Sequence, residues 1–171
     1  MTKKNNIRIS TKLKYLFLDF DGVLTNNSVY TDSKGNEYIQ SSKSDSIYVE
    51  LYSYIGVNLL VISSEKNQSV KMRCKKMKLK CFNGIKDKKV FLEKYIKKNS
   101  IQINNCGYVG NDLNDFESLK MFSYRFCPSD SNPIIKKICN YRLRSPGGGY
   151  ILREIFEKFF KLNSKKLLNL K

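Results

Sequence analysis

The chain has no histidine, no tryptophan and no alanine among its 171 residues. Without histidine, zinc sites and catalysis by Ser-His or Cys-His pairs are not expected. Proton transfer near neutral pH then falls to carboxylates, lysines or tyrosines. Long apolar runs are also missing, since none approaches the roughly 18 residues that cross a bilayer. Residues 1–12 are basic and polar and lack the apolar core of a signal peptide. We therefore expect a cytoplasmic protein without a membrane partner.

Acidic residues are scarce, with 15 Asp and Glu against 32 Lys and Arg, which gives a formal net charge of +17. The lysines are spread through every expected helix, a pattern that suggests a codon-level bias more than a polyanion partner. No basic stripe with interleaved aromatics and no nucleic-acid-binding module is present. We therefore expect no nucleic-acid partner. The competing hypothesis, a nucleic-acid-binding protein, rests on charge alone. A basic field still attracts acidic, phosphorylated small substrates.

The five cysteines form no C-x-x-C pair, and their number is odd. Such a scattered set in a chain without a leader indicates reduced thiols that serve as small core residues. The length suits one domain. No linker, repeat or change of composition divides the chain. We expect a single domain over residues 13–162, a basic N-terminal extension at 1–12 and a basic C-terminal tail at 163–171.

The most informative stretch is the apolar run at residues 15–18, which is bounded by charge and glycine and predicts a short buried strand. Asp19 and Asp21 follow it directly, and Gly22 supplies a turn. Open α/β sheets build their sites at the carboxyl ends of strands. Two carboxylates there can hold a hard divalent cation, or one can attack an electrophile. For this pattern alone, a strand that ends in a solvated polar turn is the plain alternative.

Strand and helix signals alternate through the rest of the chain and predict an α/β fold, a doubly wound, mostly parallel sheet. Ser44 is a candidate N-cap, and a hairpin that overhangs the site as a flap is expected at about 28–40. Further strands are expected at 57–62, 80–82, 106–109, 124–127 and 141–143. Helices are expected at 45–54, 65–78, 88–98, after 115 to about 120, around 134, and at 150–162 after a glycine run at 147–149.

Polar groups stand after these strands or at helix starts: Asp19 with Asp21, Ser63, Lys88, and Asn111-Asp112 with Asp115. Right-handed crossovers bring the strand ends to one rim of the sheet. Phosphoryl transfer from a monoester needs such a set. It uses a nucleophile in line with phosphorus, a cation on the phosphate, donors for its oxygens and an acid for the leaving alcohol.

In these motifs the chain resembles the haloacid dehalogenase superfamily, and within it the branch of 3-deoxy-D-manno-octulosonate 8-phosphate phosphatases. The likeness covers residues 14–160. Motif I is residues 19–25, motif II is Ser63, motif III is Lys88 and motif IV is residues 108–115. The branch also has a glycine-rich run before a late helix with an Arg-Glu pair, here 147–149 with Arg153 and Glu154. Each motif alone is weak, whereas four in order with the glycine run are specific.

The resemblance implies a Rossmann-like fold with a small hairpin flap and no large cap domain. It implies that Asp19 forms an aspartyl-phosphate and that Asp21 protonates the leaving oxygen and then activates water. Ser63 and Lys88 would hold the phosphoryl group. Mg²⁺ would be bound by Asp19, by the backbone carbonyl of Asp21 and by motif IV, where the candidates are Asn111, Asp112 and Asp115.

Motif IV departs from the superfamily pattern, which usually has Asp where this chain has Asn111. An amide oxygen can bind Mg²⁺ but adds no negative charge, so weaker metal binding is expected. Two hypotheses stay open. One is a Mg²⁺-dependent phosphatase of 2-keto-3-deoxy sugar acid phosphates in lipopolysaccharide or sialic acid biosynthesis. The other is a weak or inactive phosphatase-like partner in sugar-acid activation.

The resemblance also implies substrate-binding residues: Thr25, Asp45, Glu65 and Arg73. Glu65 stands where octulosonate enzymes usually have Arg, and it resembles the Glu of acylneuraminate 9-phosphate phosphatases and of the phosphatase-like domain of some acylneuraminate cytidylyltransferases. As plain alternatives, Glu65 and Asp45 are first-turn helix acids and Arg73 lies on a solvated helix face. The branch assembles as a homotetramer, in which the hairpin and the C-terminal tail would cover the site. The triple glycine is interpreted as a turn that feeds a helix.

Overall fold

The computed structural model describes residues 12–165. Its central strand is β1 (Tyr15–Leu18), which pairs in parallel with β4 (Asn58–Ile62) on one side and with β6 (Cys106–Val109) on the other. The sheet has the order β5-β4-β1-β6-β7-β8 and all its pairings are parallel. The outer strands are β5 (Lys80–Phe82), β7 (Tyr124–Cys127) and β8 (Tyr141–Arg142). This confirms the predicted α/β fold.

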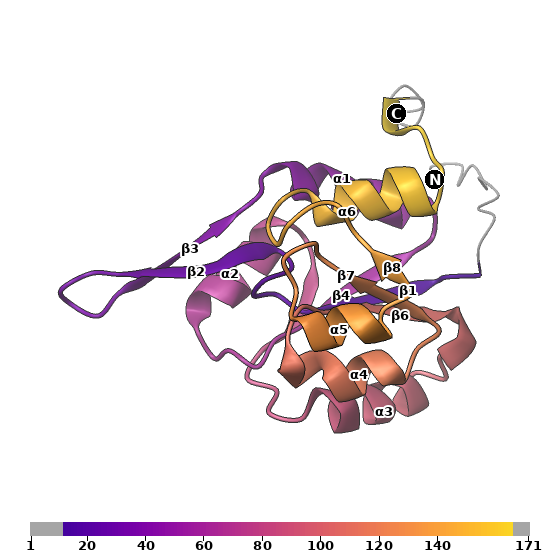
Figure 1. Cartoon of the computed structure of the whole chain (residues 1–171), viewed down its shortest axis with the longest axis horizontal. Coiled ribbons are helices and arrows are strands. Elements are labelled where there is room, and N and C mark those ends of the chain that lie inside the picture. Colours follow the sequence, from indigo (N-terminus) through magenta and orange to yellow (C-terminus); the bar gives the residue numbers. More distant parts are fainter. Residues whose placement is uncertain (1–11, 166–171) are drawn as a thin grey trace.

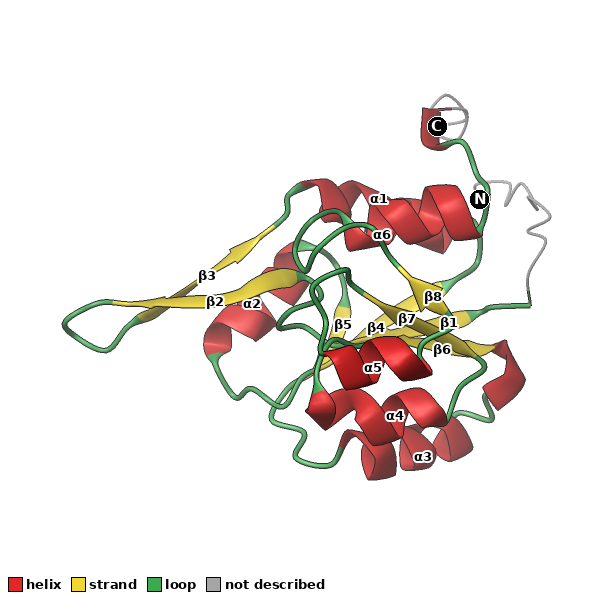
Figure 2. Ribbon diagram, viewed as in Figure 1, coloured by secondary structure: helices red, strands yellow, loops and turns green. Residues whose placement is uncertain are grey.

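Helices cover both faces of the sheet (Figures 1 and 2). On one face lie α1 (Ser44–Tyr54) and α6 (Ile151–Glu154), and on the other α3 (Lys88–Lys98), α4 (Phe116–Lys120) and α5 (Pro133–Ile138). α2 (Gln68–Lys76) packs beside β5, and its Val70 and Cys74 side chains are buried in the same hydrophobic core as residues of α1. Short 3₁₀ turns η1 (Ile103–Asn105) and η2 (Leu113–Asp115) flank β6.

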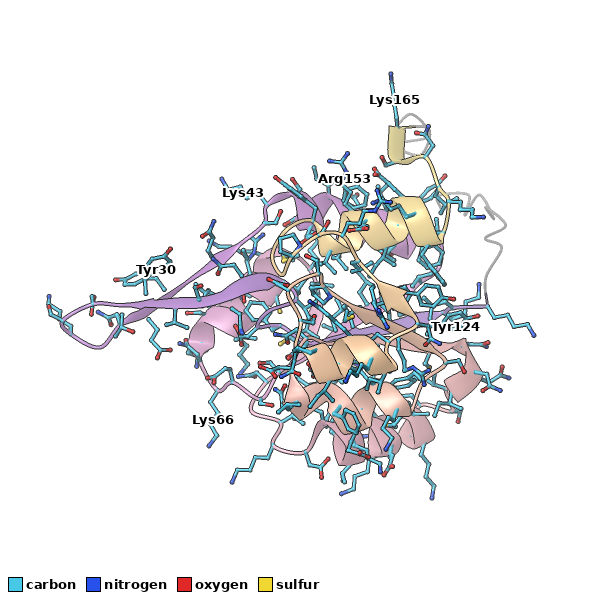
Figure 3. All side chains as sticks on the ribbon, in the orientation of Figure 1. Tyr30, Lys43, Lys66, Tyr124, Arg153 and Lys165 are labelled. Carbon is cyan, nitrogen blue, oxygen red and sulfur yellow. The ribbon has the colours of Figure 1, made fainter. Side chains whose placement is uncertain are left out.

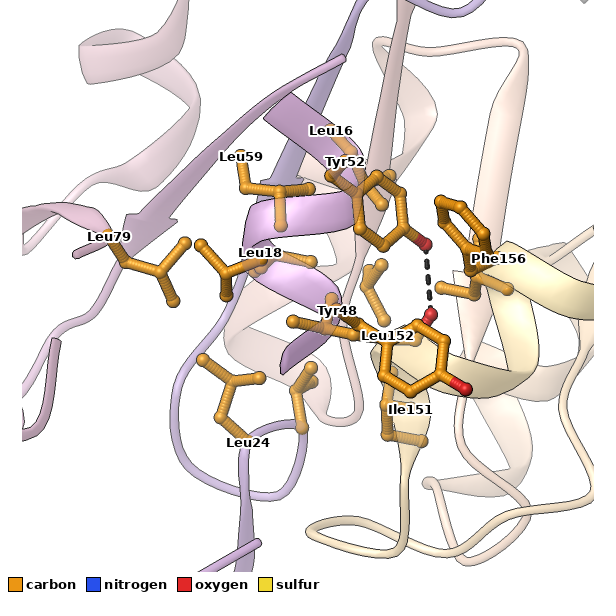
Figure 4. Close-up of a cluster of buried hydrophobic side chains, with 14 of the residues drawn as sticks. Leu16, Leu18, Leu24, Tyr48, Tyr52, Leu59, Leu79, Ile151, Leu152 and Phe156 are labelled. Carbon is orange, nitrogen blue, oxygen red and sulfur yellow. Dashed lines mark hydrogen bonds between the residues drawn. The ribbon is translucent and has the colours of Figure 1, made fainter. Parts of the chain in front are cut away.

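Each face has its own hydrophobic core. Figure 4 shows part of the first, where side chains of β1 and α1 meet α6 and the Tyr52 hydroxyl donates to the Leu152 carbonyl at 3.1 Å. The second core surrounds Phe17, Tyr108 and Phe122. Successive residues of β1 point to opposite faces, so Leu16 and Leu18 enter one core and Phe17 the other. Burial on both faces explains why the strand is continuously apolar. All five cysteines are free, as expected.

The predicted hairpin consists of β2 (Thr25–Thr31) and β3 (Glu37–Ser41). It projects from the body of the molecule (Figure 1). At its tip the Asp32 carboxylate accepts hydrogen bonds from the Lys34 and Asn36 N–H groups, and Gly35 has φ +79°. Tyr30 points away from the hairpin (Figure 3) and is 62% exposed. The hairpin therefore carries apolar surface that nothing in the described chain covers.

Three helix boundaries differ from the sequence prediction. Ser44 is the first residue of α1 and not its N-cap; its own N–H donates to the Ser42 hydroxyl. α2 begins at Gln68 because the Asn67 side chain caps it by accepting from the Ser69 N–H. The last helix, expected at 150–162, is divided into α6 and η3 (Ile155–Phe159), which is one π-helical turn. Helix caps depend on side-chain contacts that the sequence does not specify.

The expected extension and tail fall largely outside the described residues, at 1–11 and 166–171. Among the helices at 12–165, none has the length and apolarity to cross a membrane.

Candidate active site

The candidate site lies at the carboxyl ends of the three central strands. Asp19 follows β1, Ser63 follows β4 and Asn111 lies two residues beyond β6. From β1 the chain continues to β4 and β5 on one side, and then returns to the other side at β6. A parallel sheet opens a crevice where its strand order reverses in this way. The parallel pairing of β1 with β4 and β6 places the ends of these strands side by side, as the sequence predicted.

A buried charge cluster joins motifs I, III and IV. Lys88, the first residue of α3, places its Nζ 2.8 Å from Oδ1 of Asp19 and 2.7 Å from Oδ1 of Asp115. All three residues are at most 3% exposed. The cluster holds one ammonium between two carboxylates, so it has a spare negative charge when both acids are ionised. Buried charges persist only when they are paired in this way.

Burial sets the proton affinities of the cluster. For Asp19, burial and the nearby Asp115 carboxylate raise the pKa well above its ordinary value, although Lys88 and the Phe20 N–H oppose the shift. For Lys88, burial alone lowers the pKa, but the carboxylates of Asp19 and Asp115 outweigh it and raise the pKa. The lysine is therefore charged. A further cation near Asp19 would favour its ionised form.

Asp115 is fully engaged inside the protein. Its Oδ1 accepts from Lys88 and from the Tyr108 hydroxyl at 2.8 Å, and its Oδ2 accepts from the Asn111 N–H at 3.0 Å. Asp115 was one of three candidate metal ligands in motif IV, and in the single chain both of its oxygens are engaged by protein donors. The carboxylate instead fixes the lysine and the turn that carries Asn111. Tyr108 was missed from the sequence because a tyrosine inside an apolar strand gives no signal of its own.

Asp21 is held by the loop that follows β1. The Thr25 hydroxyl donates to Oδ1 of Asp21 at 3.3 Å and accepts from the Gly22 N–H at 3.2 Å. Burial raises the pKa of Asp21, and the bond from Thr25 partly offsets this. Thr25 itself is 1% exposed. The structure therefore places Thr25 behind Asp21, where it orients the acid, and not on the surface where a substrate would bind as the sequence suggested.

A cavity of about 380 Å³ adjoins both motif I acids. Six residues whose side chains carry ligand oxygens line it: Asp19, Asp21, Asn27, Asn111, Asp112 and Asn114. The Asn111 side chain lies so close to Gly22 that a Cβ at that glycine would overlap it. Carboxylates and amides of this kind are the oxygen ligands that Mg²⁺ accepts. The donor set at this cavity therefore fits a magnesium ion.

A second cavity, of about 210 Å³, lies on another side of Asp21. Glu65 lines it, and its predicted role in substrate binding stays a prediction. Because α2 starts only at Gln68, Glu65 is not a first-turn helix acid. Glu37 of the hairpin also lines this cavity, and the sequence analysis missed it because one acid beside a turn resembles any solvated strand residue.

Ser63 is buried and its hydroxyl accepts from the Glu65 N–H at 3.1 Å. Its N–H donates to the Phe82 carbonyl, and its carbonyl accepts from the Ile85 N–H. These bonds tie the end of β4 to the segment that leads into Lys88. Ser63 therefore lies on the same rim as Asp19, on the neighbouring strand.

Asp45 and Arg73 lie away from both cavities in the single chain. The Asp45 carboxylate is buried and its Oδ1 accepts from the Leu152 N–H at 3.2 Å, so it caps α6. Arg73 donates through Nη2 to the Ser42 carbonyl at 2.7 Å and to the Ser46 hydroxyl at 3.3 Å. Both side chains join α1 to its neighbours.

The glycine run at 147–149 packs directly on the loop after β1. The Gly148 N–H donates to the Val23 carbonyl at 2.9 Å, and a Cβ at Gly147 would overlap the Gly22 carbonyl. The expected turn before a helix is present. Its glycines also allow its backbone to pack closely against the backbone of the loop after β1. Glu154 holds the segment that leads into the glycine run, because its carboxylate accepts hydrogen bonds from the Arg144 and Ser145 N–H groups. The run therefore supports the loop that holds Asp21.

No family model matches the chain. The 3-deoxy-D-manno-octulosonate 8-phosphate phosphatase KdsC of Salmonella typhi is 26% identical over 156 residues, which cover 91% of this chain and 80% of that protein. A solved protein from Streptomyces avermitilis, described as a HAD family hydrolase, superimposes with a TM-score of 0.83 at 26% identity. That match covers 88% of this chain and 87% of the other. The chain is similar to proteins of the haloacid dehalogenase superfamily over most of its length.

Within this superfamily the chain is similar to the 3-deoxy-D-manno-octulosonate 8-phosphate phosphatase branch. The enzyme of that name from Moraxella catarrhalis, solved with magnesium, phosphate and KDO, shares the fold with a TM-score of 0.85 at 21% identity. The match covers 94% of each chain. The described chain therefore shares the fold of that protein, and residues 12–165 include a small hairpin but no large cap domain.

Proposed function

We propose that the chain is a magnesium-dependent phosphatase of a 2-keto-3-deoxy sugar acid phosphate, with 3-deoxy-D-manno-octulosonate 8-phosphate as the favoured type. The observation that carries the proposal is the buried Asp19–Lys88–Asp115 cluster, which opens beside Asp21 into a cavity lined by oxygen donors. The names of the relatives support the substrate class. An acylneuraminate 9-phosphate is the second candidate. Glu65 resembles the Glu of acylneuraminate 9-phosphate phosphatases, and it lines a cavity together with Asp21.

Asp19 supplies the nucleophile. Its Oδ1 is held by Lys88 and by the Phe20 N–H, while its Oδ2 has no hydrogen bond within residues 12–165. Oδ2 attacks phosphorus, and the bond from phosphorus to the leaving oxygen breaks. The product of this step is an aspartyl-phosphate on Asp19.

Asp21 moves the proton. Its raised pKa favours a protonated carboxyl that gives its proton to the leaving alcohol. The resulting carboxylate then takes a proton from water, which attacks the aspartyl-phosphate and restores Asp19. Lys88 and the Ser63 hydroxyl hold the phosphoryl oxygens. When bound by Asp19, the Asp21 carbonyl, Asn111 and Asp112, magnesium neutralises phosphate charge.

The decisive test is Asp19→Asn, which keeps the size of the side chain but removes the nucleophile. We expect the unmodified protein to release phosphate from 3-deoxy-D-manno-octulosonate 8-phosphate in the presence of Mg²⁺, and the variant to lose at least about a thousandfold in kcat, on the scale seen for such groups. Thermal unfolding of both proteins controls for folding. Turnover by the variant at the unmodified rate would exclude Asp19 as the nucleophile.

Asn111 favours a second candidate function, a weak or inactive partner in sugar-acid activation. Asn111→Asp adds a charge to the cavity, and we expect it to tighten Mg²⁺ binding by about tenfold because hard cations prefer charged oxygen ligands. Isothermal calorimetry measures the change, with Asn104→Asp, an exposed position in η1 at the other end of β6, as the control. If the unmodified protein binds no Mg²⁺ and releases no phosphate while Asn111→Asp does both, the second function is the better description.

The hairpin supports an assembly, and we propose that the protein forms a homotetramer in which the exposed hairpin is covered by neighbouring copies. Val29, Tyr30 and Tyr38 are between 53% and 62% exposed on it. Apolar strands of this kind are a liability unless they are buried in an interface.

A further inference from the structure

The second cavity beside Asp21 has a distinct chemistry. We call it the flap pocket, because it lies between the hairpin and the first turn of α2. Three apolar side chains form part of its wall: Val29, Ile39 and Val70. The polar part of the wall comes from Asp21, Asn27, Glu37, Glu65, Asn67 and Ser69. A ligand group that lies here therefore reaches the acid that would protonate the leaving oxygen.

The wall of the flap pocket contains carboxylates, amides and a hydroxyl but no lysine or arginine. This is unexpected in a chain with 32 basic residues. A carboxylate placed in the pocket would lose its water and meet Glu37 and Glu65 without a compensating cation, which is costly. Hydroxyl groups, in contrast, can donate to these carboxylates, and a carbon chain can pack on the apolar wall. The pocket therefore suits a neutral polyhydroxyl group.

Glu37 is held in place by Asn67. The Asn67 Nδ2 donates to Oε2 of Glu37 at 2.7 Å, while the Asn67 Oδ1 caps α2 by accepting from the Ser69 N–H at 2.9 Å. One side chain thus fixes the hairpin to the helix and orients the Glu37 carboxylate. Oε1 of Glu37 has no hydrogen bond within the described part of the chain, which leaves it available to a ligand hydroxyl.

We propose that Glu37 is a specificity-determining residue, positioned by Asn67, and that the flap pocket binds the neutral polyhydroxyl part of the leaving group next to the phosphate. Glu37 accepts a hydrogen bond from a substrate hydroxyl, and the acidic end of the substrate lies outside the pocket. This inference rests on the proposed phosphatase function and specifies which part of the substrate the pocket binds.

The test is Glu37→Gln, assayed with three phosphates. The Gln carbonyl oxygen can still accept from Asn67, so its NH₂ group replaces the free acceptor with a donor. For 3-deoxy-D-manno-octulosonate 8-phosphate and for mannitol 1-phosphate, whose polyol part is uncharged, we expect KM to rise about fivefold, the effect of one lost hydrogen bond, with kcat within about twofold. For p-nitrophenyl phosphate, whose leaving group has no free hydroxyls, KM stays unchanged.

Two further variants separate binding from structure. Asn67→Ser keeps a cap for α2 but cannot reach Glu37, so KM for both polyol phosphates rises while p-nitrophenyl phosphate is unaffected. Glu93→Gln, on the exposed face of α3, is the matched control and leaves all three KM values unchanged. An unchanged KM for the polyol phosphates in Glu37→Gln overturns the proposal. So does an equal rise for all three substrates, or a rise for the sugar acid phosphate alone.

Failure of the proposed function gives a different result. If the unmodified protein hydrolyses none of the three phosphates, the phosphatase function fails, and the flap pocket is then tested by calorimetry with 3-deoxy-D-manno-octulosonate. Binding that weakens about fivefold in Glu37→Gln supports the pocket, at the size of one hydrogen bond. No binding, or equal binding by both proteins, overturns it.

Discussion

At the scale of residues, Asp45 shows how burial changes the behaviour of a carboxyl group. Its Oδ1 accepts from the Leu152 N–H, but its Oδ2 is buried without a hydrogen-bond partner. Burial raises the pKa of Asp45 to about 6, although the N–H groups of Leu152 and Arg153 and the charge of Arg73 oppose the shift. Between about pH 4 and pH 6 the folded chain therefore holds a proton on Asp45 that the unfolded chain has lost.

This proton makes stability depend on pH. Because the folded pKa lies above the ordinary value of 3.8, the folded state loses stability as pH rises from about 4 to about 6. We expect Asp45→Asn to remove the part of this loss that Asp45 causes, so that its free energy of unfolding relative to the unmodified protein improves by up to about 3 kcal/mol between pH 4 and pH 8. Urea unfolding at the two pH values measures the difference, and a pH-independent difference would contradict it.

The residues of the site differ in how far the sequence could predict them. Asp19, Ser63 and Asn111 were predictable because each closely follows an apolar strand, and strand direction alone brings them together. Asp115 and Thr25 were predicted near the site but with other roles. Whether a polar side chain faces a cavity or another side chain depends on packing, which spacing along the sequence does not determine.

At the scale of elements, the glycine run and the loop after β1 form one unit. Gly148 has φ +68°, and a Cβ there would lie 2.8 Å from the Thr25 carbonyl carbon. Gly35, at the hairpin tip, has a similar φ of +79° but open space around it. The two positions therefore separate the cost of backbone strain from the cost of a collision.

We expect Gly148→Ala to lower the free energy of unfolding by about 3 kcal/mol, since it adds overlap with backbone to the strain of a positive φ. Gly35→Ala carries the strain alone and should cost about 1 kcal/mol. Urea unfolding compares them. Phosphate release should fall only in Gly148→Ala, because the displaced loop carries Asp21. Equal costs for the two variants would show that the close contact has no energetic role.

Most elements were predictable from apolar patterning, and their ends were not. The strands β1, β4 and β6 are short apolar runs whose pattern matches burial on both faces. The start of α2 was missed because a helix can also be capped at Ser64, and only the folded structure shows that the Asn67 side chain accepts from the Ser69 N–H. The π-helical turn of η3 has no marker in the sequence.

At the scale of the whole molecule, the projecting hairpin is the feature that a single chain does not explain. Its exposed aromatic residues are Tyr30 and Tyr38. We expect the double variant Tyr30→Ser, Tyr38→Ser to shift the proposed tetramer toward smaller species, because both substitutions remove apolar side-chain area from the proposed interfaces. Sedimentation velocity at several concentrations measures the distribution, with Tyr141→Ser on β8 as a control. A monomeric unmodified protein would refute the assembly.

The parallel sheet was predictable because helices and strands alternate along the chain, and right-handed crossovers leave few arrangements. The strand order was not, since the position of β6 beside β1 depends on which apolar faces fit together. The high net charge gave no information about the fold, because surface lysines constrain packing very little.

The hydrogen bond from Gly148 to the Val23 carbonyl also has a consequence for synthesis. During translation the loop that carries Asp21 leaves the ribosome well before the glycines that support it. A nascent chain thus contains Asp19, the proposed nucleophile, long before it has a stable reaction centre. Hydrolytic competence should arise abruptly, when α6 docks on the finished sheet.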